Sequence, residues 1–272
     1  MPTSPAPVVL VGLVTHPRSR FDADGTATSQ AHGLVRALTA AGVPAQALIS
    51  DRDDHDPSTA PLDRGELLRS ARYQAGLEHR WRRYLARAGG RPSRAGLVDA
   101  AAAAAMAVTR MLRTDALLPW QSGRSGQVAA TRLLNIDLSH LRVLEAASTA
   151  GASWVLVLED DARVDDVDRA AAGLLHAIEA VTPTPVAFVS LSESIPLAEL
   201  GVEGIVGDTA VPGGPPWLVR TRTPVTNTVC ANLYRASFAA ELAAGIRSRG
   251  LTPVAPIDWR VNEQVMARVG DD

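Results

Sequence analysis

Residues 154–161 of this 272-residue chain read Trp154-Val155-Leu156-Val157-Leu158-Glu159-Asp160-Asp161. Five apolar residues, most of them branched, end abruptly in three carboxylates. A short apolar run of this kind is typical of a strand that is buried on both faces of a sheet. Open α/β sheets bind their ligands outside the carboxyl ends of the strands, where these three acids lie. The stretch therefore predicts an α/β fold and the position of its functional site.

The three adjacent acids favour a bound cation. Two carboxylates about 4 Å apart repel each other by roughly 4 kcal/mol at an effective dielectric constant of about 20. A packed cluster is therefore stable only if it is solvated, protonated or neutralised by a cation. Oxygen ligands are typical of Mg²⁺ and Mn²⁺ sites, and these ions suggest a phosphate-bearing substrate.

Composition excludes several classes of protein. A hydrophobic content of 46% indicates a globular chain, and a net charge of -2 gives no support for nucleic-acid binding. The sequence contains no lysine, which excludes a P-loop and a Schiff-base mechanism. The single cysteine, Cys230, cannot form an internal disulfide, which fits a reducing cytoplasm. The apolar run 8–14 is too short to span a bilayer, so we expect a cytoplasmic protein.

Strands and helices are expected to alternate along most of the chain. We expect strands at 8–14, 45–50, 154–158, 186–191 and 225–233. Helices are expected at 28–41, 133–150, 166–180 and 237–246, with a last short helix after 256–258. Thr28 or Ser29 is the expected cap of the first helix, and Gly42 its end. The order predicts a single Rossmann-like domain over 1–272, with a mixed, mostly parallel sheet and right-handed crossovers.

Residues 57–125 interrupt this alternation as a helical insertion. The segment holds 12 arginines against 5 acidic residues, a balance of about +7. Projected as a helix, Leu77 and Trp81 share one arc with Tyr84 and Leu85, and five arginines share another: Arg69, Arg72, Arg80, Arg83 and Arg87. Two interpretations remain open. The arginines form a solvated helix face, or they form a basic lid that contacts an anionic acceptor or a membrane surface.

Three elements in order resemble the family 25 glycosyltransferases, which include lipopolysaccharide and collagen sugar transferases. The first is Asp137-Leu138-Ser139-His140-Leu141 on a helix, followed about twenty residues later by the strand that ends in Glu159-Asp160-Asp161. The second is the stretch 227–233 with the helix after it, and the third is Pro256-Ile257-Asp258. The resemblance covers about a quarter of the chain closely.

The resemblance implies an A-type glycosyltransferase (GT-A) domain that uses a divalent metal, Mn²⁺ or Mg²⁺, and a nucleotide-sugar donor. Transfer would proceed with inversion to an acceptor hydroxyl of a glycan, a lipid-linked intermediate or a small molecule. Glu159 and Asp161 would hold the metal, and Asp160 would turn toward the ribose or back to the scaffold. Asp258 is the first candidate for the general base and Glu193 is its rival. For these acids, the alternative is an ordinary helix cap or surface carboxylate.

The remaining site candidates would bind the donor. Thr15, Arg18 and Arg20 follow the first strand, where the nucleotide lies in A-type folds, and arginine suits bidentate contact with phosphate. Arg132 and Asn135 precede the Ser-His pair. His140 is either a hydrogen-bonded structural residue or a residue that orients the acidic loop or contacts the donor.

Two other classes of function remain open. The chain could be another metal-dependent enzyme acting on nucleotide phosphates, such as a nucleotidyltransferase or a hydrolase. Against a nucleotidyltransferase, the loop after the first strand carries no glycine over 15–20. The chain could also be a non-catalytic binding protein that kept the fold, in which case nucleotide binding would be indifferent to metal.

Overall fold

The computed structural model of the chain describes residues 7–16, 19–51, 124–192, 229–249 and 257–269. Shorter pieces are described at 73, 76–77, 79–80, 101, 105, 209–210, 213–214 and 218–220. Two site candidates, Arg18 and Glu193, lie outside these residues, as does the side chain of Arg132.

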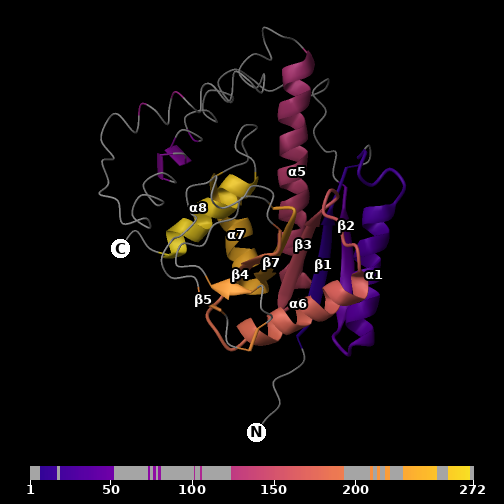
Figure 1. The fold of residues 1–272 in the computed structure, drawn as a ribbon. Coiled ribbons are helices and arrows are strands. Elements are labelled where there is room, and N and C mark those ends of the chain that lie inside the picture. The colour runs from indigo at the N-terminus through magenta and orange to yellow at the C-terminus, as the bar shows by residue number, and fades with distance from the viewer. Residues whose placement is uncertain are drawn as a thin grey trace.

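A five-stranded open sheet forms the centre of the fold (Figure 1). Its strands lie in the order β2-β1-β3-β7-β4 and comprise β1 Val9–Val14, β2 Ala45–Ser50, β3 Trp154–Glu159, β4 Phe188–Ser190 and β7 Ala231–Arg235. β1 pairs in parallel with β2 and β3, whereas β7 is antiparallel to both of its neighbours, β3 and β4. The α/β class and the mixed, mostly parallel sheet are therefore confirmed. A separate two-stranded ribbon joins β5 Thr209–Ala210 to β6 Val219–Arg220.

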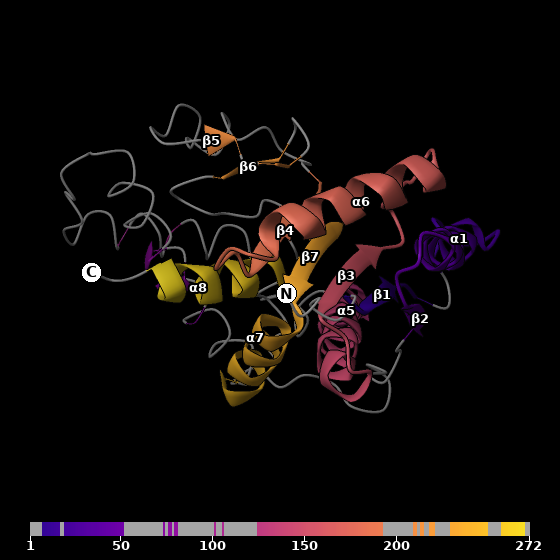
Figure 2. The ribbon, with the colours of Figure 1, turned by 90° about the horizontal axis from the view of Figure 1, so that it is seen from below.

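Helices cover both faces of the sheet, as the two views show (Figures 1 and 2). α1 Thr26–Ala40 and α6 Val167–Val181 pack on one face, and α5 Arg124–Thr149, α7 Ala236–Arg249 and α8 Ile257–Val269 pack on the other. Leu156 and Leu158 of β3 point into the first layer, and Val155 and Val157 point into the second. Alternate residues of this strand thus reach two apolar cores, as expected for a strand that is buried on both faces.

Gly12 in the middle of β1 lets α5 lie close to the sheet. A Cβ atom at this position would overlap the side chain of Val143 on α5, and Val143 is fully buried. The close approach presses α5 against β1 beside β3. The polar residues of α5 are thereby brought to the carboxyl ends of these strands.

The first helix, α1, starts before the residue at which it was expected to start. α1 begins after Gly25, which has a φ of 73°, and Thr28 lies inside the helix, where its side chain donates to Asp22. The expected cap at Thr28 or Ser29 was therefore wrong, because the preceding loop supplies its own acceptors for the first amides. At the other end of α1, Gly42 follows with a φ of 84°, in the left-handed region that favours glycine.

The described part of the insertion is helical and touches α8. Leu77 is fully buried, and Tyr73 and Arg80 both bind the Glu263 carboxylate of α8. Arg80 is therefore engaged with the domain, and the other four arginines of its predicted arc lie outside the described residues. Most of the insertion lies outside the described residues, so the single-domain organisation over 1–272 stays a prediction.

In the part of the chain that the structure describes, no helix has the length and apolar character needed to cross a membrane.

Candidate functional site

The site lies at the edge of the sheet where β1 and β3 end and β7 begins. β1 and β3 are parallel, so their carboxyl ends meet; β7 is antiparallel to β3, so its amino end lies at the same edge. The backbone N–H of Glu159 donates to the Cys230 carbonyl at 2.8 Å, and that of Asp160 donates to Val14 at 3.0 Å. The acidic end of β3 is therefore held by backbone bonds from both sides.

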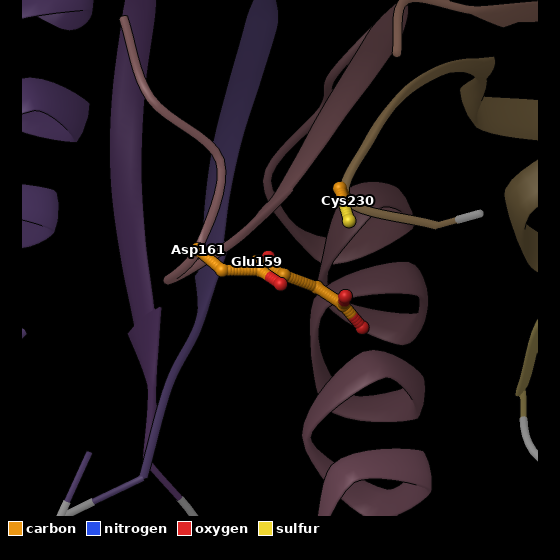
Figure 3. A group of neighbouring side chains, drawn as sticks. All are labelled: Glu159, Asp161 and Cys230. Atoms are coloured by element: carbon orange, nitrogen blue, oxygen red, sulfur yellow. The ribbon is translucent and has the colours of Figure 1, made fainter. Parts of the chain in front are cut away.

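Glu159, Asp161 and Cys230 form a group with the composition of a metal site (Figure 3). One potential ligand atom of each residue lies within 4.8 Å of those of the other two. Glu159 and Asp161 come from the end of β3, and Cys230 comes from the segment that leads into β7 (Figure 3). The two acids predicted as metal ligands both belong to this group, and their binding of a metal stays a prediction. Cys230 had no predicted role, because its position beside Glu159 depends on β7 running antiparallel to β3.

His140 holds the innermost carboxylate of this group. Its Nε2 lies 2.9 Å from Glu159 Oε1, and the histidine side chain is only 3% exposed. Burial alone would raise the pKa of Glu159, but the hydrogen bond and charge of His140, together with a hydrogen bond from the Cys230 thiol, lower it. Glu159 is thus kept ionised in a mostly buried position. This contact fits both alternatives for His140, a hydrogen-bonded structural residue and a residue that orients the acidic loop.

The other two acids of the cluster have different surroundings. Asp161 is exposed, and its pKa is raised by partial desolvation and by the neighbouring charge of Glu159. Asp160 accepts a hydrogen bond from Thr15 Oγ1 at 3.0 Å. Asp160 therefore turns back to the scaffold, which was one of its two predicted orientations. The bond also links the loop after β1 to the acidic strand end.

Asp258 belongs to the same electrostatic cluster. It lies in the first turn of α8, where its Oδ1 accepts from the Trp259 N–H at 2.8 Å. The pKa of Asp258 is raised to about 6, mainly by desolvation and also by the charge of Glu159, while the Trp259 N–H and the charge of His140 oppose the shift. Asp258 on α8 is therefore within electrostatic range of Glu159 on β3 and His140 on α5. A partly exposed acid with so perturbed a pKa is typical of a functional position.

Behind Asp258 lies a buried ion pair that the sequence did not predict. Arg260 Nε on α8 is 3.4 Å from Asp137 Oδ2 on α5, and each side chain is 1% exposed. Burial raises the pKa of Asp137 well above its usual value, Arg260 opposes this shift, and Asp258 and Glu159 add to it. Asp137 stands one helical turn before His140. The spacing of three residues on a helix was the available signal, but the partner of Asp137 was not identifiable from sequence.

The remaining predicted donor-binding residues are less closely connected to the acids. Arg20 places its guanidinium over the ring of Phe21, 4.6 Å from the centroid, in the loop after β1. Phe21 is 37% exposed, so this pair lies at the surface. Asn135 is 2% exposed on α5, which argues against direct contact with a soluble donor. Arg18, Glu193 and the side chain of Arg132 are outside the described residues and stay predictions.

The donor set fits a divalent cation. Two carboxylates at one strand end suit Mg²⁺ or Mn²⁺, which prefer oxygen ligands. The Cys230 thiol lies beside both carboxylates, and neither Mg²⁺ nor Mn²⁺ needs it as a ligand. Comparisons with protein-family models, with curated proteins and with solved structures gave no match for this chain.

Proposed function

We propose that this protein is a metal-dependent inverting glycosyltransferase of the GT-A type, which moves a sugar from a nucleotide-sugar donor to an acceptor hydroxyl. One observation carries the proposal. Two carboxylates, Glu159 and Asp161, stand at the carboxyl end of β3, and Glu159 is within electrostatic range of a partly exposed carboxyl group on another element, Asp258. Glu159 and Asp161 suit a cation, and Asp258 suits proton transfer. This reaction requires both a cation and a group that takes up a proton.

Glu159 and Asp161 would hold the metal. When bound, the ion would supply positive charge to the diphosphate that departs as the bond to the sugar breaks. His140 supports this role because it orients Glu159 and keeps it ionised through the contact at 2.9 Å. Hydrogen bonds to a ligating carboxylate typically strengthen and orient its contact with the metal.

Asp258 would accept the proton of the acceptor hydroxyl. With a pKa of about 6, it is mostly ionised at neutral pH and more basic than an ordinary aspartate. Efficient general bases have a pKa near the working pH, because both the ionised fraction and the basicity are then high. Inversion needs such a base on the side of the sugar opposite to the leaving group.

The loop after β1 would contact the nucleotide. Thr15 and Asp160 join this loop to the acidic strand end, and Arg20 is the described cation next to it. The position supports a donor site, because ligands of open α/β sheets lie outside the carboxyl ends of the strands. The acceptor would then approach from the side of α8, which carries Asp258.

A thermal-shift panel of nucleotide sugars tests the proposal. In the presence of Mn²⁺, one donor should stabilise the wild-type protein, because stabilisation follows ligand affinity. The same donor should give no shift without Mn²⁺ or with Asp161→Asn, and Asp168→Asn on α6 serves as the matched control. Release of nucleoside diphosphate with sugar transfer should accompany binding. Donor shifts that are equal with and without Mn²⁺ would instead support a non-catalytic binding protein, and release of nucleoside monophosphate would support a nucleotidyltransferase or hydrolase.

A further inference from the structure

α8 is held in place by a charged residue that points inward. Arg260, which is 1% exposed, lies two residues after Asp258 in the same helix. Its guanidinium stands between two partners from distant parts of the chain: the carboxylate of Asp137 on α5 and the ring of Tyr73, whose centroid is 5.5 Å away. A buried guanidinium is stable only with such partners, because an uncompensated charge is strongly disfavoured in the interior.

Asp137 also lies close to the start of α8. Ile257 is the first residue of that helix, and a carboxylate near a helix N-terminus is stabilised by the helix dipole. Asp258 follows Ile257 and precedes Arg260 by two residues, so it lies in the turn that the ion pair with Asp137 holds.

α5 connects this turn to the metal-binding end of β3. Asp137 and His140 are one helical turn apart, so they project from the same side of α5. His140 binds Glu159, and Asp137 binds Arg260. Since α5 itself is seated closely on β1 at Gly12, its two side chains set the position of Glu159 and that of α8 from a single rigid element.

We propose that Asp137 is a positioning residue: through its ion pair with Arg260 it fixes the first turn of α8, and thereby sets the position of Asp258 in that turn. The assignment of Asp258 as the base rests on the proposed function, whereas the placement of Asp258 by Asp137 does not. The charged groups that face Asp258 in the described residues are Glu159 from β3 and Asp137 and His140 from α5, with Arg260 on α8 itself.

A double variant separates positioning from simple stabilisation. Asp137→Leu/Arg260→Met replaces the buried ion pair by apolar side chains of similar size, a change that proteins often tolerate, whereas either single variant leaves a buried charge unpaired. Three quantities are measured for the wild type and the double variant: stability by chemical denaturation, the titration of the Asp258 carboxyl carbon by ¹³C NMR without metal or donor, and kcat and KM for transfer. Asp258→Asn identifies the Asp258 signal.

If Asp137 positions Asp258, the double variant should recover most of the stability that the single variants lose. It should not restore the position of Asp258. As the first turn of α8 loosens, Asp258 gains water, and the pKa at which it titrates should fall from about 6 toward the ordinary value of 3.8. The kcat should drop roughly 10- to 100-fold with an unchanged KM for the donor, because small displacements of a reacting group have effects of that size. Because Asp137→Leu also removes a negative charge that faces Asp258, Asp137→Glu, which keeps the charge and adds one methylene, is measured in every case and should shift the titration in the same direction.

An Asp258 titration that stays near 6 in the folded variant would overturn the inference, whether or not transfer occurs. A titration that moves while no nucleotide sugar is ever used would support the inference and contradict the proposed function. The two ideas can therefore fail separately.

Discussion

Replacing Asp258 by asparagine should stabilise the protein at neutral pH. The folded-state pKa of about 6 lies roughly two units above the ordinary value of 3.8, and each unit corresponds to about 1.4 kcal/mol. The folded state thus binds more protons than the unfolded state between about pH 4 and pH 6, so its stability falls as pH rises through this window. At pH 7 the ionised Asp258 destabilises the fold by about 3 kcal/mol relative to its protonated form. Asparagine, which does not ionise, avoids that loss.

Chemical denaturation between pH 4 and pH 8 measures the effect. The stability of Asp258→Asn minus that of the wild type should grow by about 2.4 kcal/mol from pH 4 to pH 7 and then level off. Val261→Ala, at a buried position without a titratable group in the same helix, is the control, and its stability difference should not change with pH. If the stability difference between Asp258→Asn and the wild type does not change between pH 4 and pH 8, the reasoning is refuted. Such a result would mean that Asp258 has the same pKa in the folded and unfolded states.

Three further predictions concern the metal site and the packing around it. Asp161→Ala should abolish the donor-induced thermal shift in Mn²⁺ while leaving the circular dichroism spectrum unchanged; a retained shift would exclude Asp161 as a ligand. His140→Ala removes the hydrogen bond that keeps the pKa of Glu159 low, so Mn²⁺ affinity measured by calorimetry should fall roughly 10- to 100-fold, and more at pH 6 than at pH 8. An equal loss at both pH values would contradict this explanation. Gly12→Ala should destabilise the protein by about 1–3 kcal/mol or more in urea denaturation, and Gly12→Ala/Val143→Ala should recover part of the loss; full stability of the single variant would show that α5 does not pack against Gly12.

Local pattern predicted the strands of the parallel half of the sheet well. The second strand was expected at 45–50 and is found there, and the strand expected at 154–158 ends one residue later, at Glu159. The run of β3 is apolar on both faces, so its pattern alone identifies it, whereas β2 at the edge of the sheet is a short, mainly apolar run that follows the first helix. β7 was expected at 225–233 and lies at Ala231–Arg235, antiparallel to its neighbours. Pairing direction depends on contacts between distant segments, which no local pattern contains.

The site was predictable where its residues are consecutive and unpredictable where they meet through tertiary packing. Glu159 and Asp161 stand at the end of one strand, so strand and acids were recognised together. The contact of Asp137 with Arg260 requires the packing of α5 against α8, since these residues are more than a hundred positions apart. α5 also begins at Arg124, nine residues before the expected start at 133, because the residues before 133 lack a clear apolar period.

The reversed direction of β7 has a practical consequence. It places the only sulfhydryl of the chain, that of Cys230, beside both candidate ligands of the metal. Alkylation with a maleimide would therefore label a single, known location. Protection of this label by Mn²⁺ would report occupancy of the acidic tip without any knowledge of the sugar or the acceptor.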